Sequence, residues 1–184
     1  GLGDVYKRQV FMLKKLKELN NKRISWGLLL LSCISFLGAG FYFQYNMGLE
    51  PCHLCIIQRI AFLIIAISSI FALINPMKNY LIYISNIIWI AGSSLGLYGG
   101  IKLVHMQMNP PEFSFGSSCT LNAEELMNNY PFLDWFPMMF EAKGSCSESS
   151  YSFFGILTME QLTLFIFVVL FSISILSLIS LFRK

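Results

Sequence analysis

The amino-acid sequence predicts an all-α integral membrane protein, built as an antiparallel bundle of four transmembrane helices with a long outer loop. Of its 184 residues, 55% are hydrophobic and only 12% are charged, whereas a soluble domain averages about 25% charged residues. Four apolar stretches each approach the roughly 20 residues that cross about 30 Å of hydrocarbon. In lipid the backbone must satisfy its own hydrogen bonds, so these stretches should be helices.

The four predicted spans cover residues 26–45, 55–74, 80–104 and 158–182, with outer loops at residues 46–54 and 105–157. Residues 1–11 fit nothing that follows them, so we expect a scar or a disordered segment ahead of a single membrane domain of residues 12–184. The first stretch could instead be a signal peptide, because basic residues precede it. Its apolar length is too great for that, and no A-x-A-like site closes it.

Charged residues between the spans predict their orientation. The segment of residues 106–157 carries six acidic residues and one basic residue, Lys143. Basic residues instead flank the opposite ends of the spans: Lys14, Lys15, Lys17, Lys22, Arg23, Lys78, Arg183 and Lys184. The positive-inside rule therefore places both termini and the Lys78 turn in the cytoplasm, and both cysteine-bearing loops outside.

Two further segments have an expected structural role. Gly92, Gly96 and Gly100 recur every four residues in the third span, a pattern that lets membrane helices approach closely, and we interpret it as bundle packing. In the long outer loop, Thr120 or Asn122 could cap a short helix over residues 123–129. We expect this segment to lie on the membrane surface with its apolar face down, although contact with the top of the bundle is an alternative.

Cys52 and Cys55 form a C-x-x-C pair at the outer start of the second span, within EPCHLCIIQR. Three interpretations stay open: a structural disulfide, half of a zinc site that would need further ligands, or a redox-active dithiol. The last is favoured by a helix N-terminus, whose unpaired N–H groups stabilise a thiolate. The spacing C-H-L-C differs from C-x-x-C-H, which argues against haem attachment.

Arg59 follows Cys55 by four residues, so the two side chains share one helix face, with Cβ atoms about 5–6 Å apart. A cation at the centre of a span costs at least about 2.5 kcal/mol, and less where it can reach the interface. Arg59 could simply extend to the lipid headgroups, but we favour a function. It could stabilise the Cys55 thiolate, or bind an electron acceptor that gains negative charge, such as a lipid-soluble quinone.

The remaining cysteines divide into a loop pair and a single residue. Cys119 and Cys146 lie in small, polar surroundings, FGSSCT and KGSCSES, where a disulfide would be reachable by another protein. A structural staple of the loop is the alternative. Cys33 lies within the first span, where we expect a small apolar side chain facing lipid or a helix interface.

Together these features closely resemble the DsbB family of bacterial membrane thiol oxidases. The resemblance covers residues 12–184, and the stretches PCHLCIIQR and GSCSESSYSFFGI carry it most specifically. It implies an inner-membrane location with both termini cytoplasmic and the cysteine loops periplasmic. It also implies ubiquinone or menaquinone as cofactor, a DsbA-like thioredoxin-fold protein as partner, and neither a metal nor nucleic acid.

The resemblance assigns a role to each site residue. Cys119 and Cys146 would form the disulfide that reduced DsbA attacks, with Cys119 in the mixed disulfide. Cys146 would then exchange with Cys52, and Cys55 would react with the quinone. Arg59 matches the quinone-site arginine of the family. His105 lies near a family histidine linked to that site, although an ordinary interfacial histidine fits equally well.

Three other proteins share parts of this pattern. A tetraspanin-like organiser also has four spans and a cysteine loop, but its Cys-Cys-Gly signature is absent from this sequence. A vitamin-K-reductase-type enzyme usually places its C-x-x-C toward a later span. A DsbB relative that serves one dedicated partner cannot be distinguished from the general enzyme by sequence.

Overall fold

Four long helices make up most of the described structure. The computed structural model describes residues 11, 15–16, 18–49, 51–75, 79–108, 152–153 and 157–182. The long helices are α2 (Arg23–Asn46), α3 (His53–Ile74), α4 (Asn79–Met108) and α7 (Met159–Phe182). Each is long and apolar enough to cross a membrane. The predicted fold class, a bundle of four candidate membrane-spanning helices, is therefore confirmed, and α4 continues four residues beyond its predicted end at residue 104.

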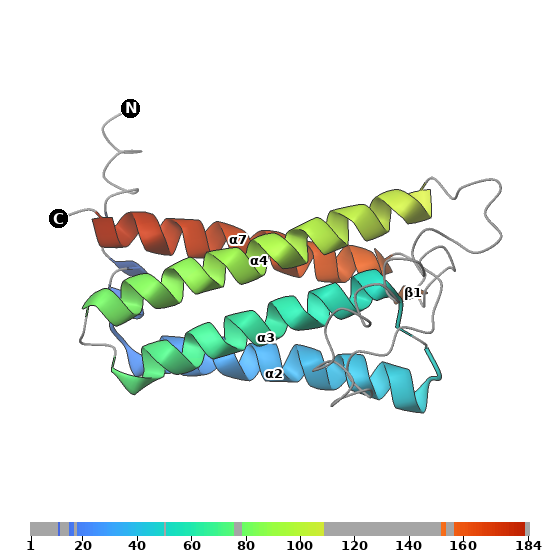
Figure 1. Ribbon diagram of the computed structural model, residues 1–184, viewed down its shortest axis with the longest axis horizontal. Coiled ribbons are helices and arrows are strands. Elements are labelled where there is room, and N and C mark those ends of the chain that lie inside the picture. The colour runs from blue at the N-terminus through green and yellow to red at the C-terminus, as the bar shows by residue number, and fades with distance from the viewer. Residues whose placement is uncertain are drawn as a thin grey trace, which may run out of the picture.

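The helices lie side by side and alternate in direction (Figure 1). The starts of α3 and α7 lie at one end of the bundle, together with the ends of α2 and α4. We call this the dithiol end, because Cys52 and Cys55 lie there. We call the opposite end, where α3 finishes and α4 begins, the network end. The predicted surface helix over residues 123–129 lies outside the described residues.

Local sequence sets where two of the helices stop and start. After α2, Gly48 has a φ of 66°, a left-handed conformation that glycine adopts without a Cβ penalty. Ahead of α7, a short antiparallel pair joins β1 (Ser152–Phe153) to β2 (Leu157–Thr158). Thr158 and Gln161 then exchange side-chain bonds to each other's backbone N–H at 3.4 Å. This reciprocal pair is a capping box, which fixes the first turn of α7.

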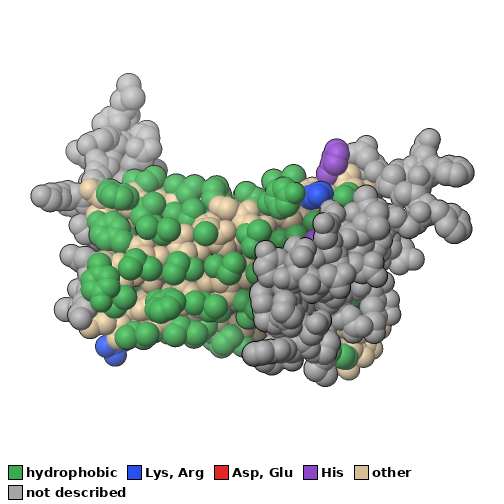
Figure 2. All heavy atoms as spheres, viewed as in Figure 1, with side chains coloured by type: hydrophobic (Ala, Val, Ile, Leu, Met, Phe, Trp, Pro, Cys, Tyr) green, Lys and Arg blue, Asp and Glu red, His purple; other side chains and the backbone are tan. Residues whose placement is uncertain are grey.

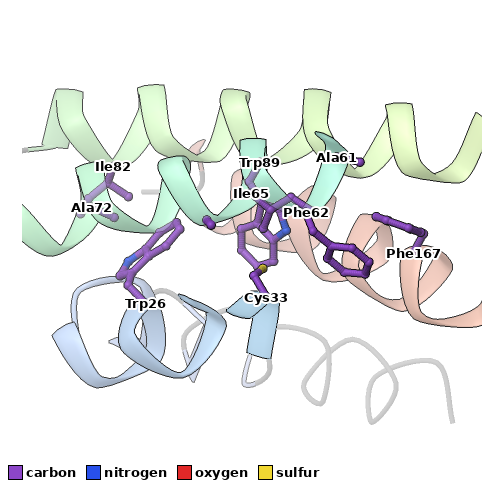
Figure 3. Packing of buried hydrophobic residues seen from close by; sticks show 10 residues of the cluster. Trp26, Cys33, Ala61, Phe62, Ile65, Ala72, Ile82, Trp89 and Phe167 are labelled. Atoms are coloured by element: carbon purple, nitrogen blue, oxygen red, sulfur yellow. The ribbon is translucent and has the colours of Figure 1, made fainter. Parts of the chain in front are cut away.

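The core consists of aromatic and small residues from all four helices (Figure 3). Trp26 of α2 meets Trp89 of α4 edge to face at 5.7 Å, and the rings of Phe62 and Phe167 are 4.5 Å apart. Cys33 is 1% exposed and belongs to this cluster. It therefore lies at a helix interface, the second of the two places predicted for it.

Glycines in α4 let this helix approach both of its neighbours. A Cβ on Gly96 would overlap the Phe167 ring of α7, and one on Gly92 would lie 2.9 Å from Ile65 Cγ1 of α3. A Cβ on Gly100 would lie 3.1 Å from Leu164 Cδ1 of α7. The predicted packing role of these three glycines is confirmed, because they face the two helices that pack against α4.

Hydrogen bonds between helices gather at the network end. The Ser177 hydroxyl of α7 lies 2.8 Å from Asn20 Oδ1 and 2.6 Å from Asn86 Oδ1, and its single proton can serve one of them at a time. The Trp26 indole N–H donates to the Asn20 carbonyl at 2.8 Å, and the Tyr83 hydroxyl donates to the Leu181 carbonyl at 3.0 Å. These bonds tie α2, α4 and α7 together.

The flank of the bundle is apolar. Figure 2 shows hydrophobic side chains along the visible face, with Lys, Arg and His only near its two ends. Along α2, Ile24, Leu28 and Leu31 are 74%, 59% and 60% exposed, and they recur at helical spacing on one face. Such a stripe faces lipid when the helix spans a bilayer.

Candidate functional site

The C-x-x-C pair forms the first turn of α3. Cys52 is the N-cap residue in an extended conformation, and its sulfur accepts the Cys55 backbone N–H at 3.4 Å. The two sulfurs are 2.8 Å apart and hydrogen-bonded to each other as free thiols. The two sulfurs of the predicted pair therefore lie together, at a helix end whose N–H groups and dipole favour negative charge on sulfur.

The two cysteines differ in the exposure of the whole residue. Cys52 is 4% exposed and packs with Leu54 and Leu103, whereas Cys55 is partly exposed. The hydrogen bond from the Cys55 side chain lowers the pKa of the Cys52 thiol, and burial acts in the opposite direction. Cys52 is therefore the sulfur on which this local structure favours a thiolate.

Arg59 lies one turn further along α3. Its guanidinium lies over the Phe41 ring of α2, 5.0 Å from the ring centroid, and it interacts electrostatically with both sulfurs. A Cβ on Gly40 would lie 3.9 Å from Arg59 Nε, an ordinary van der Waals distance, so α2 passes directly beside the arginine. Arg59 Nη1 is buried without a hydrogen-bond partner among the described residues. One NH2 group of a fixed cation is thus available beside the dithiol.

Gln58 and Glu160 are buried polar residues at the same end, and the sequence analysis did not identify them. They are 6% and 7% exposed, and Gln58 Nε2 and Glu160 Oε2 have no hydrogen-bond partner among the described residues. Glu160 interacts electrostatically with both sulfurs. A sequence signal for Glu160 does exist, because an acidic residue that opens an apolar span is rare and often functional.

The other predicted site residues are placed as follows. His105 is exposed near the end of α4, whereas Leu103 and Met106 are the α4 residues that pack with the dithiol. The predicted role of His105 at the quinone site stays a prediction. Cys119 and Cys146 lie outside the described residues. Within the described part of the chain, no group of three or more His, Cys, Asp or Glu side chains could hold a metal ion.

Comparison with known proteins identifies the family. The family model for disulfide bond formation protein DsbB matches residues 22–177. Disulfide bond formation protein B of Haemophilus influenzae (strain 86-028NP) is 37% identical over 160 residues, which is 85% of each chain. The Histophilus somni (strain 129Pt) protein of the same name is 34% identical over 173 residues, covering 94% of this chain and 95% of the relative.

The family model includes α2, the dithiol, α3, α4 and residues 159–177 of α7, and the family name implies an oxidoreductase role in disulfide formation. The resemblance predicted from the cysteine and arginine pattern is confirmed. This chain belongs to the DsbB family of disulfide bond formation proteins.

Proposed function

We propose that this protein is a membrane thiol:quinone oxidoreductase, which reoxidises a periplasmic DsbA-like dithiol protein and passes two electrons to a membrane quinone. The observation that carries the proposal is the pair of hydrogen-bonded sulfurs at the start of an apolar helix, with Arg59 within electrostatic range of both. A sulfur pair at this boundary can meet a water-soluble partner on one side and a lipid-soluble acceptor on the other.

Thiol–disulfide exchange would deliver the electrons to this pair. In our proposal, a thiolate of the partner attacks the Cys119–Cys146 disulfide at Cys119 and forms a mixed disulfide. The partner's second thiol then resolves it, so the partner leaves oxidised and two electrons and two protons pass to the loop cysteines. Cys146 then attacks Cys52 of the Cys52–Cys55 disulfide, which becomes a dithiol while the loop disulfide re-forms. Each exchange needs a thiolate, a disulfide and access between them.

Arg59 fits the binding of a quinone. Its unpartnered Nη1 could donate to a carbonyl oxygen of the quinone, and the neighbouring Phe41 ring offers an apolar surface. A positive charge beside the acceptor would favour the negative charge that develops there. A bound quinone would take up the two electrons and two protons and leave as quinol. His105, exposed near the end of α4, is a second proposed contact for it.

The proposed orientation places the dithiol end at the periplasmic face of the bacterial inner membrane. Both termini and the Lys78 turn then lie in the cytoplasm, as the positive-inside rule predicts. The starts of α3 and α7 share the dithiol end of the bundle (Figure 1). The two segments that carry the cysteine pairs therefore connect to the same end, which supports exchange between them.

The test is quinone reduction by the purified protein in detergent, with a reduced DsbA-like protein as electron donor. We expect one quinone to be consumed for each disulfide formed in the partner. The loss of quinone absorbance measures the first quantity, and counting of free thiols measures the second. Cys55→Ser should insert normally and abolish quinone reduction. Turnover that is unchanged in this variant would rule out the proposed electron path.

A double variant separates the two cysteine pairs. Cys119→Ser with Cys146→Ser should still form the Cys52–Cys55 disulfide, visible by mass spectrometry after alkylation, but should fail to oxidise the partner. Normal oxidation of the partner would instead show that the second pair is only a structural staple.

A further inference from the structure

The Glu160 carboxyl group lacks the structural role that its position would ordinarily suggest. Acidic residues in the first turn of a helix commonly complement the helix dipole. In α7, however, Thr158 and Gln161 already cap the first turn through their side chains. Glu160 is 7% exposed, and its Oε2 has no partner among the described residues. Burying a carboxyl oxygen without a hydrogen-bond partner is unfavourable, so packing alone does not explain this residue.

The packing of three helices places Glu160 level with the dithiol. A Cβ on Gly100 of α4 would lie 3.3 Å from Gln58 Nε2 of α3 and 3.1 Å from Leu164 Cδ1 of α7. Gln58 and Leu164 are therefore at the same height in the bundle. Both α3 and α7 begin at the dithiol end (Figure 1). One helical turn is about 5.4 Å. Moving one turn toward the start of α3 leads from Gln58 to Leu54 and Cys55, and moving one turn toward the start of α7 leads from Leu164 to Glu160.

The dithiol thus lies within electrostatic range of a carboxyl group and a guanidinium. Arg59 stacks on Phe41 of α2, and Glu160 belongs to the first turn of α7. Each of these charged groups interacts electrostatically with both sulfurs. Among the described residues, other titratable groups near this end include His53, Tyr42 and Tyr45, and Tyr98, Lys102 and His105 of α4. Lys102 interacts electrostatically with His53.

Of the two charged groups that interact with both sulfurs, only one can exchange a proton. An arginine keeps its proton under all ordinary conditions. A carboxyl group gains and loses one readily, and buried carboxyls commonly serve as acid–base groups. We propose that Glu160 is the acid–base partner of the Cys52–Cys55 dithiol. Its carboxylate takes up a proton as a thiol becomes a thiolate, and returns it when the electrons leave.

The step is balanced as follows. An S–H bond breaks and an O–H bond forms on Glu160, while the electron pair remains on sulfur. When the disulfide forms, two electrons pass to the acceptor, and both thiol protons follow, one of them after residing on the carboxyl group. The acceptor is the quinone of the proposed function, and this inference rests on that function only for the final step. The tests below contain no quinone, so a failure here is distinguishable from a failure of the proposed function.

Infrared difference spectroscopy gives a direct test in the full-length protein, with Cys33, Cys119 and Cys146 replaced so that only the dithiol reacts. Reduction with dithiothreitol should change the C=O band of a protonated carboxyl group. The band change should vanish in Glu160→Gln and persist in Glu18→Gln, which removes an exposed carboxylate of the segment that precedes α2. A difference spectrum without a carboxyl band, or a band that survives in Glu160→Gln, would overturn the proposal.

The alkylation rate of the reduced dithiol by iodoacetamide across pH is the second readout. In the parent protein a thiolate forms either against the charge of the carboxylate or together with proton uptake by Glu160. Glu160→Gln removes both requirements, so alkylation at neutral pH should rise about threefold or more, since Coulomb repulsion inside a protein is only partly screened. Glu18→Gln should match the parent protein, and an unchanged profile in Glu160→Gln would contradict the proposal. A shifted profile with no carboxyl band would show a charge effect without proton exchange, which also rejects the proposal.

If Glu160→Gln does not fold, Glu160→Asp should move the carboxyl band to a new frequency, and an unmoved band would count against the proposal.

Discussion

The two ends of the bundle use buried polar groups in opposite ways. At the network end, hydrogen bonds link Asn20, Asn86 and Ser177 across three segments of the chain, with the Ser177 proton shared between the two amide oxygens. At the dithiol end, four buried side-chain atoms have no partner among the described residues, those of Gln44, Gln58, Arg59 and Glu160. Two further atoms of this kind, in Ser85 and Trp89, lie on α4 near Asn86, so unsatisfied groups are more numerous at the dithiol end but are not confined to it.

This difference separates a stabilising region from a reactive one. An interhelical hydrogen bond in a membrane protein contributes on average about 0.6 kcal/mol, so a closed network adds modestly to stability and fixes how the helices meet. An unsatisfied buried donor or acceptor costs about 1–3 kcal/mol. Such a cost is tolerated where the group meets a reactant, so the dithiol end has the polar pattern of a binding and catalytic site.

The largest expected effect comes from the middle of α4, which joins the two ends. Gly96→Leu places a side chain where the Phe167 ring lies, and overpacking of this kind typically costs about 1–3 kcal/mol and sometimes more. We expect loss of the folded bundle, and with it of both stability and activity, measured by thermal unfolding in detergent and by quinone reduction.

Gly38→Leu on α2 is the matched control, because a Cβ at Gly38 meets no atom within 4 Å. It should change neither measurement. Equal damage from both variants would show that the α4 glycines have no special packing role.

At the dithiol end, Arg59→Ala should impair function without loosening the bundle. Losing a charge-assisted hydrogen bond costs about 1.5–3 kcal/mol, so kcat/KM for quinone should fall about 10- to 100-fold, measured by quinone absorbance. Arg59→Lys should recover part of it, because the charge remains but the planar group does not.

Lys102→Ala removes a second cation, from α4, and serves as the control. Its kcat/KM for quinone should stay close to that of the parent protein. If Arg59→Ala weakened partner binding as much as quinone use, Arg59 would have a structural role instead.

At the network end, Ser177→Ala should reduce stability and leave turnover intact. It removes the hydroxyl between Asn20 and Asn86 and leaves their amide oxygens buried, a loss of about 1–2 kcal/mol. Ser172→Ala on the same helix is the comparison, because the Ser172 hydroxyl is exposed and bonds only the Val168 carbonyl. Reversible unfolding in mixed detergent micelles measures both. A Ser177 variant that matched the Ser172 variant would remove the contrast between the two ends.

The smallest effect concerns the pH dependence of Cys52 in the reduced protein. The Cys55 side chain lowers the pKa of the Cys52 thiol, so alkylation of Cys52 should persist to lower pH than for an ordinary thiol. Cys55→Ala removes this donor and should move the profile back to higher pH. Because the pKa of the Cys52 thiol is lower in the folded protein than in the unfolded chain, ionisation of Cys52 stabilises the folded protein. This stabilisation is complete above the pKa of Cys52 in the unfolded chain. That effect is lost as pH falls through the lowered value. Coincident profiles in the two proteins would show that the sulfur–sulfur bond has no such effect.

The sequence was sufficient to predict features that depend on one helix or on the solvent around it. The spans follow from the cost of unsatisfied backbone in lipid, and the proximity of Arg59 to Cys55 follows from their spacing of four residues along one helix. The importance of Gly96 is likewise visible in a repeat of small residues along a single helix.

Features that depend on how helices meet were not predictable in this way. Glu160 is distant from Cys55 in sequence, and the two become level only through contacts at Gly100. His105 illustrates the same limit, because the rotation of α4 that exposes it is set by packing against α3 and α7. The roles of Cys119 and Cys146 stay predictions from the family resemblance.

The Cys52 sulfur has two roles, one in holding the start of a helix and one in the sulfur pair. It closes the first turn of α3 by accepting the Cys55 N–H, and it is also half of the proposed redox pair. Each cycle of oxidation and reduction must therefore change the group that holds the helix start in place. The amide hydrogen-exchange rates of this turn should therefore differ between the oxidised and the reduced protein, so the backbone would report the redox state of the pair.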